Sequence, residues 1–268
     1  MDKYRLKHKK VFNVKKKKPI YRSKIFWLLI LCLAFFGSAF YFLLFSPYFQ
    51  IKVINVSGNI SVKSADIMPI IENNTKKKIV FFETKNIFLA NLKEAKLQIL
   101  ERFPKIEKVA IARNFTGQIT AEIKERAAFG EVCGEVCFNF DKEGIAFEQA
   151  QDNGTGEIKV NFEVRDYKIT LGKQEILLEN VAAIAGISGI LTDNFNILPK
   201  VFILSMDQKK LAAKTSEGWI AYFALDQNIN SAISNLDILL KEKISIKDRA
   251  NLDYIDLRYG NRIFYKKK

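Results

Sequence analysis

Acidic side chains are the residues of this chain whose type and spacing come closest to a hydrolytic site. Two carboxylates held together can act as general acid and general base, as in the hydrolysis of glycosidic bonds. The sequence offers two such groups, Asp141 with Glu143 and Glu148, and Asp253 with Asp256. Turn chemistry explains the stretch "DKEG" at least as well, since Asp and Gly are typical turn residues. We therefore expect no catalytic residue and keep a carboxylate enzyme as the alternative.

Histidine and cysteine, the other common catalytic and metal-binding residues, are scarce. The single histidine, His8, lies in a basic N-terminal tail. The rest of the chain therefore lacks histidine, which is the commonest general base and a common zinc ligand. Cys133 and Cys137 supply only half of a tetrahedral zinc set. We expect no metal and no cofactor.

The two cysteines stand in "FGEVCGEVCFNF", which predicts two strands that turn at Gly134-Glu135. This arrangement places the two sulfurs on facing strands. The spacing does not settle the geometry of a bond, so a disulfide between Cys133 and Cys137 and two free buried thiols both stay open. The third cysteine, Cys32, lies in an apolar stretch and is interpreted as a small apolar filler.

That apolar stretch, "IFWLLILCLAFFGSAFYFLLF", covers residues 25–45 and contains no charge. As a helix it is about 30 Å long, which matches the hydrocarbon thickness of a bilayer. A cleaved signal peptide would have a shorter apolar region that stops before small residues. Here the apolar run continues past Gly37-Ser38-Ala39, so we predict an uncleaved transmembrane helix.

Basic residues are concentrated before this stretch. Residues 1–24 hold nine Lys and two Arg against Asp2, a net charge of 11 − 1 = +10 out of +14 for the chain. The positive-inside rule then predicts a cytoplasmic tail (1–24), a helix (25–45) and a bulk outside the membrane, a type II topology. We interpret the tail as a topology determinant that also contacts the lipid bilayer. A nucleic-acid arm or a docking peptide is the alternative, but no aromatic platform alternates with the basic residues, so we expect no nucleic-acid partner.

Residues 46–126 show the order strand, helix, helix, strand, strand. A strand with a bulge is expected from Phe49 to Val56, a short helix from Ser64, and a second amphipathic helix over 88–102 with Leu97 on its apolar face. Two alternating runs then follow in "FPKIEKVAIARNFTGQITAEIKER", residues 103–126. Such an order predicts a small sheet covered on one face by helices.

Residues 127–268 read mostly as strands separated by turns. Two helices interrupt them, at about 174–191 and 228–241, where apolar residues recur at helical spacing. The fold class is therefore α+β: one transmembrane helix, a strand-helix-helix-strand-strand domain, and a mostly antiparallel β-domain with two helices.

Several of these stretches resemble the bacterial cell-division family FtsQ/DivIB. The similar stretches are "FQIKVINVSGNISVKSADI", the hairpin that ends at Glu125-Arg126, "CFNFDKEGIAF", "GWIAYF" and "YIDLRY". The resemblance implies a POTRA domain (βααββ) over 46–126 and an FtsQ/DivIB-type β-domain over 127–268. A Thr-Gly at 116–117 replaces the family's usual Pro, and residues 150–215 match loosely.

The resemblance also implies a function. The implied function is that of a non-enzymatic scaffold of the division machinery, located in the plasma (inner) membrane at the septum. Such a scaffold recruits FtsB-like and FtsL-like single-span proteins. It contacts other divisome proteins through its POTRA domain. Through these partners it would influence septal wall synthesis. The alternative is a membrane-anchored, extracytoplasmic wall-processing enzyme that uses the paired carboxylates.

The partner site is expected on the last strands. "YIDLRY" alternates two sets of side chains, and a terminal strand is a natural sheet edge to which a partner strand can add. The family's FtsB-binding segment matches the region around Tyr259. The predicted partner-binding residues are Tyr254, Asp256, Arg258, Tyr259, Asn261, Ile263 and Phe264.

Overall fold

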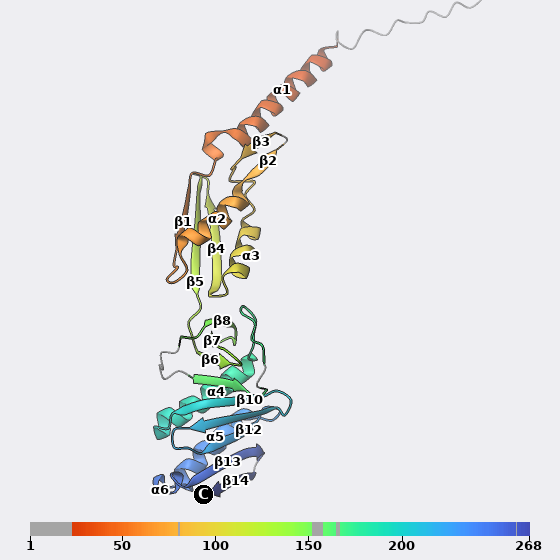
Figure 1. Ribbon diagram of the computed structural model, residues 1–268. Coiled ribbons are helices and arrows are strands. Elements are labelled where there is room, and N and C mark those ends of the chain that lie inside the picture. The colour runs from red at the N-terminus through yellow and green to blue at the C-terminus, as the bar shows by residue number, and fades with distance from the viewer. Residues whose placement is uncertain (1–22, 80, 152–157, 165–166, 261) are drawn as a thin grey trace, which may run out of the picture.

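The computed structural model describes residues 23–79, 81–151, 158–164, 167–260 and 262–268, and these form an elongated molecule. A long apolar helix, α1 (Lys24–Phe45), lies at one end, and the C-terminus lies at the other (Figure 1). Within the described residues, α1 is the only helix long and apolar enough to cross a membrane. A single turn of 3-10 helix, η2 (Pro47–Phe49), connects it to the first sheet.

The first sheet has three strands in the order β1-β5-β4. Strand β5 (Gln118–Glu125) lies in the middle, parallel to β1 (Val53–Ser57) and antiparallel to β4 (Ile106–Asn114). Helices α2 (Ser64–Thr75) and α3 (Leu92–Arg102) contribute Ile67, Ile71 and Ile99 to its core. The two helices and three strands follow the expected chain order, with a short hairpin between the helices.

The expected alternation in β5 is also confirmed. Ile119, Ala121 and Ile123 are buried, whereas the residues between them are exposed. The three buried side chains point into the core and the others point to solvent, because successive side chains of a strand point to opposite faces.

Three details of this first part differ from expectation. Residues 47–49 form a helical turn rather than the start of a strand, because Pro47 begins it and Ser46 caps it. Leu97, expected on the apolar face of the second helix, is exposed, and Ile99 is buried instead. A short hairpin, β2 (Lys77–Ile79) and β3 (Phe82–Thr84), stands between the two helices and was not expected.

The second sheet has nine strands in the order β14-β13-β12-β11-β10-β9-β6-β7-β8. Five neighbouring pairs are antiparallel and three are parallel, so the sheet is mixed with an antiparallel majority. Its strands are β6 (Gly130–Cys133), β7 (Cys137–Phe140), β8 (Ala146–Gln149), β9 (Ile158–Phe162), β10 (Pro199–Ser205), β11 (Lys210–Thr215), β12 (Ile220–Ala224), β13 (Leu252–Tyr259) and β14 (Arg262–Lys267).

Helices α4 (Leu178–Gly189) and α5 (Ile229–Glu242) pack with this sheet into one core around Trp219, Phe202 and Phe223. The first helix starts four residues later than the expected 174, and a π-helical turn (Ile190–Asn194) extends its end. A short helix, α6 (Ile246–Arg249), precedes β13.

The turn expected at "DKEG" is confirmed. Gly144 donates its amide to the carbonyl of Asp141 (2.9 Å) and has φ +78°. A Cβ at this position would lie 1.9 Å from the carbonyl oxygen of Ile176, so both the backbone angle and the space require glycine.

Candidate functional site at the edge of the large sheet

Strand β14 forms one edge of the nine-stranded sheet. Among the described strands it pairs only with β13, its antiparallel neighbour, and β13 in turn pairs in parallel with β12. An edge strand presents backbone N–H and C=O groups on its outer side, to which another chain can add a strand.

A shallow groove of about 600 Å³ lies beside this edge. Its lining residues are Gln227, Tyr254, Asp256, Arg258, Tyr259, Arg262 and Phe264. Five of the seven predicted partner-binding residues therefore meet in one place. Gln227 and Arg262 were missed; Gln227 precedes α5 and reaches the groove only through the fold, where its side-chain amide donates to the carbonyl of Arg258 (3.0 Å).

Arg258 is the organising side chain of the groove. Its Nε and Nη2 donate to Asp256 at 2.8 and 2.6 Å, and its guanidinium lies over the rings of Tyr222 (5.4 Å) and Tyr259 (5.7 Å). The hydrogen bonds that Arg258 donates to Asp256 raise the pKa of Arg258. Burial alone would raise the pKa of Asp256, but the hydrogen bonds from Arg258 lower it, so both groups stay charged.

Two exposed aromatic side chains complete the groove. The rings of Tyr259 and Phe264 meet edge to face at 5.4 Å, and the two residues are 55% and 51% exposed. Aromatic and arginine side chains gathered at one place are typical of protein-binding hot spots.

The structure corrects the expected alternation in "YIDLRY". Asp256 is buried and Tyr259 is exposed, the reverse of a strict two-residue period. The pairing with β14 shifts register between Asp256 and Tyr259, and such an irregularity turns the following side chains to the other face.

Two predicted residues do not contribute to the groove as far as it is described. Ile263 is partly buried and packs on the core of the nine-stranded sheet, so its side chain serves folding rather than the groove. Asn261 lies outside the described residues.

The carboxylates considered for an enzyme each contact a cation. Asp141 pairs with Arg126, Glu148 with Lys105, Asp253 with Lys266 and Asp256 with Arg258, while Glu143 lies 3.8 Å from Arg126. Ion pairing accounts for these side chains without a catalytic role.

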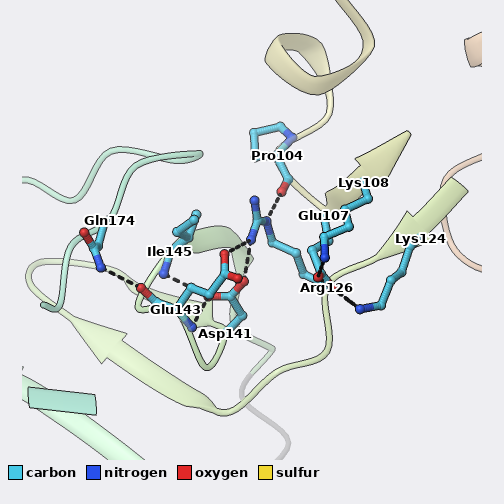
Figure 2. A network of polar contacts seen from close by, with 9 residues as sticks. All are labelled: Pro104, Glu107, Lys108, Lys124, Arg126, Asp141, Glu143, Ile145 and Gln174. Carbon is cyan, nitrogen blue, oxygen red and sulfur yellow. Dashed lines mark hydrogen bonds and ion pairs between the residues drawn. The ribbon is translucent and has the colours of Figure 1, made fainter. Parts of the chain in front are cut away.

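Figure 2 shows the junction between the two sheets, where Arg126 follows the end of β5. Its Nε donates to the carbonyl of Pro104 (3.1 Å) in the first part, and its Nη1 pairs with Asp141 in the second. Asp141 also accepts the amides of Glu143 (2.9 Å) and Ile145 (3.0 Å). Arg126 thus ties the two sheets together through a nearly buried ion pair.

Glu125, the residue before Arg126, holds a loop of the first sheet. Its carboxylate accepts the amides of Ile60 (2.7 Å), Ser61 (2.9 Å) and Val62 (2.9 Å), and the hydroxyl of Ser61. Burial would raise the pKa of Glu125, but the hydrogen bonds from Ser61, Val62 and Ile60 outweigh it and lower the pKa to about 2.

We expect Glu125→Gln to destabilise the chain by about 1–2 kcal/mol near neutral pH, because the charged acceptor is lost. A depressed pKa contributes stability that is present above about pH 4.5 and lost as the pH falls toward 2. The difference in unfolding free energy between wild type and variant should therefore shrink over this window. Glu122→Gln, at an exposed carboxylate on the same strand, is the control. A difference that does not change with pH would contradict the loop-holding role.

Cys133 and Cys137 are direct cross-strand partners between β6 and β7, with Cα atoms 4.1 Å apart and their sulfurs bonded. Glu131 lies close enough to form a three-ligand set with them, but sulfurs bonded to each other do not ligate a metal. The disulfide remains a proposal for the protein in its native compartment.

Its test is alkylation of the unreduced full chain. We expect one thiol to react, the free Cys32, and three after reduction. Reduction should cost at most about 2 kcal/mol, because the closed loop is short. The variant Cys133→Ala/Cys137→Ala should not respond to reductant at all. Three thiols alkylated before reduction would end the proposal.

The described residues make an α+β chain with one N-terminal apolar helix and a β-rich body, which is consistent with a single-pass membrane protein. Over 103 residues the chain is 41% identical to "Cell division protein DivIB" of Clostridium acetobutylicum. The match covers 38% of this chain and 38% of that protein. No family model matches the chain. The similarity supports a relationship to the FtsQ/DivIB family and a role in cell division.

Proposed function

We propose that the chain is a non-enzymatic, single-pass scaffold of the bacterial division machinery. It recruits FtsB-like and FtsL-like proteins outside the membrane and so connects assembly of the division site to septal wall synthesis. The observation that carries this proposal is the open edge of β14 beside a groove lined by arginine and aromatic side chains. The partial similarity to a DivIB protein supports the same process.

The proposed organisation has four parts. Residues 1–24 are a cytoplasmic tail, 25–45 cross the plasma membrane, 46–126 form a POTRA domain that meets other divisome proteins, and 127–268 form the β-domain. The charge of +10 before the helix supports the type II orientation, and the two separate cores support the boundary near residue 126.

Partner binding is proposed to occur by strand addition. A strand of the partner pairs with the outer side of β14, and its side chains enter the groove around Arg258. Backbone hydrogen bonds then provide affinity, while the fixed, charged pair of Arg258 and Asp256 provides selectivity for a polar group on the partner.

The test compares the two classes of function on the same material. Full-length protein in detergent is incubated with exterior segments of FtsB-like and FtsL-like proteins and, separately, with purified peptidoglycan. A scaffold binds the segments and releases no fragments from the glycan. The enzyme hypothesis would replace the scaffold hypothesis if wild type releases glycan fragments, the Asp253→Asn/Asp256→Asn variant does not, and the segments do not bind.

A further inference from the structure

The hairpin of β2 and β3 lies beside the C-terminal end of α1, as Figure 1 shows. Its aromatic residues are unusually exposed for a soluble surface, with Phe81 85% and Phe82 64% accessible. The ring of Phe82 nevertheless meets that of Phe45, the last residue of α1, at 5.8 Å. The hairpin is therefore in direct contact with the end of the apolar helix.

Buried polar side chains fix this position. Asn86 donates to the carbonyls of Leu43 (2.7 Å) and Leu44 (3.1 Å), and Thr84 donates to that of Leu44 (3.0 Å). The last turn of a helix leaves such carbonyls without intrahelical partners, so these contacts act as a cap supplied from the hairpin segment. Because Asn86 and Thr84 are almost fully buried, the hairpin and α1 are held as one body.

A row of aromatic contacts runs from the C-terminal end of α1 toward the first sheet. Phe42 meets Phe49 (6.3 Å), Phe49 meets Phe88 (5.4 Å), and Phe88 meets Phe115 (6.1 Å), which lies in the turn between β4 and β5 and is 74% exposed. Exposed apolar surface of this kind next to a membrane helix is typical of a membrane-contacting region.

The hairpin is also basic. Residues 76–85 contain four Lys and one Glu, a net charge of 4 − 1 = +3. Lys76 and Lys85 share the carboxylate of Glu72, whereas Lys77 and Lys78 are exposed at the start of β2. Lysines beside exposed phenylalanines match a surface of anionic phosphate groups over an apolar layer.

We propose that the hairpin, through Phe81, Phe82, Lys77 and Lys78, sits in the headgroup layer of the outer leaflet and binds anionic phospholipids there. The inference rests on the membrane-spanning part of the proposed function. A 22-residue helix is about 33 Å long, close to the hydrocarbon thickness, so its C-terminal end and the hairpin fixed to it lie at the interface. The hairpin then sets the orientation of the first sheet relative to the membrane.

Fluorescence quenching in reconstituted vesicles tests this placement. The full chain is placed in vesicles of phosphatidylglycerol and phosphatidylcholine that carry bromine on the acyl chains close to the headgroup. Trp27 in α1 reports whether the helix has inserted, and Trp219, fully buried in the second sheet, is an unquenched reference. In the Trp27→Phe/Phe81→Trp variant we expect at least a roughly twofold loss of the new residue's emission.

The control variant is Trp27→Phe/Leu97→Trp, because Leu97 is exposed on α3, and helix α3 lies farther from α1 than the hairpin does (Figure 1). It should not be quenched. Adding Lys77→Glu/Lys78→Glu to the Phe81→Trp variant should reduce the quenching, and unchanged quenching would overturn the anionic-lipid assignment.

Quenching of Trp27 in wild type without quenching of the Phe81→Trp variant would overturn the hairpin proposal alone. An unquenched Trp27 would overturn both this proposal and the membrane anchor on which it rests.

Discussion

The Tyr259→Ala variant should bind the FtsB-like exterior segment roughly 30-fold more weakly than wild type, and Phe264→Ala should do the same. Each side chain is a half-exposed aromatic that lines the groove, and the two rings support each other at 5.4 Å. Truncation of an aromatic anchor at the centre of an interface costs about 2 kcal/mol or more, which corresponds to that factor in Kd. Titration calorimetry with the purified segment measures it.

Tyr265→Ala is the matched control. Tyr265 is the next residue of β14, is 48% exposed, and does not line the groove, because successive strand residues point to opposite faces. Loss of the Tyr265 ring should leave the Kd for the segment within about a factor of two of the wild-type value. Equal weakening in all three variants, or loss of folding by circular dichroism, would place the site elsewhere.

A proline at Ile263 tests the backbone part of the same proposal less cleanly. It removes one N–H of the edge strand, but the Ile263 side chain packs on the core of the nine-stranded sheet. We therefore expect Ile263→Pro to weaken binding and to lower the melting temperature at the same time. The alanine variants at Tyr259 and Phe264 avoid this second effect.

Removal of Arg126 should produce the largest loss of stability that we predict. Arg126→Ala leaves Asp141, whose side chain is 6% exposed, without its counter-charge, although two backbone amides still bind it. Breaking a buried pair by deleting one partner costs roughly 3 kcal/mol or more. For a chain of this size the melting temperature should fall by about 6–12 °C. Differential scanning calorimetry of the full chain in detergent measures it.

Lys124→Ala provides the comparison for Arg126→Ala. Lys124 lies in β5, just before Arg126, and pairs with Glu107 at 2.8 Å (Figure 2), but its own side chain is 59% exposed. Glu107 keeps a second cation, Lys108 at 3.5 Å, when Lys124 is removed, and no unpaired charge is then buried, so this variant should melt close to wild type. The double variant Arg126→Ala/Asp141→Ala should recover part of the lost stability, since no charge is then buried unpaired. Similar melting of Arg126→Ala and Lys124→Ala would contradict a structural role at the junction.

The local parts of this protein follow from the sequence alone. An uncharged run of 21 residues predicts α1, the alternation in β5 predicts which of its side chains are buried, and "DKEG" predicts its turn. Each of these depends on residues that are neighbours along the chain. The stretch "YIDLRY" also led us to predict Tyr254, Arg258 and Tyr259 as members of one site, and the structure brings them to one groove.

Only the tertiary structure decided how these parts meet. Tyr259 is exposed after the register shift between β13 and β14, Asp256 is buried and paired with Arg258, and Gln227 joins the groove from a distant loop. Arg126 pairs with Asp141 because the turn after β7 lies next to the end of β5. The hairpin of β2 and β3 lies against α1 only because Asn86 and Thr84 reach carbonyls about forty residues earlier. Contacts between distant residues depend on which strands pair and in which register, and no local period of apolar residues encodes that choice.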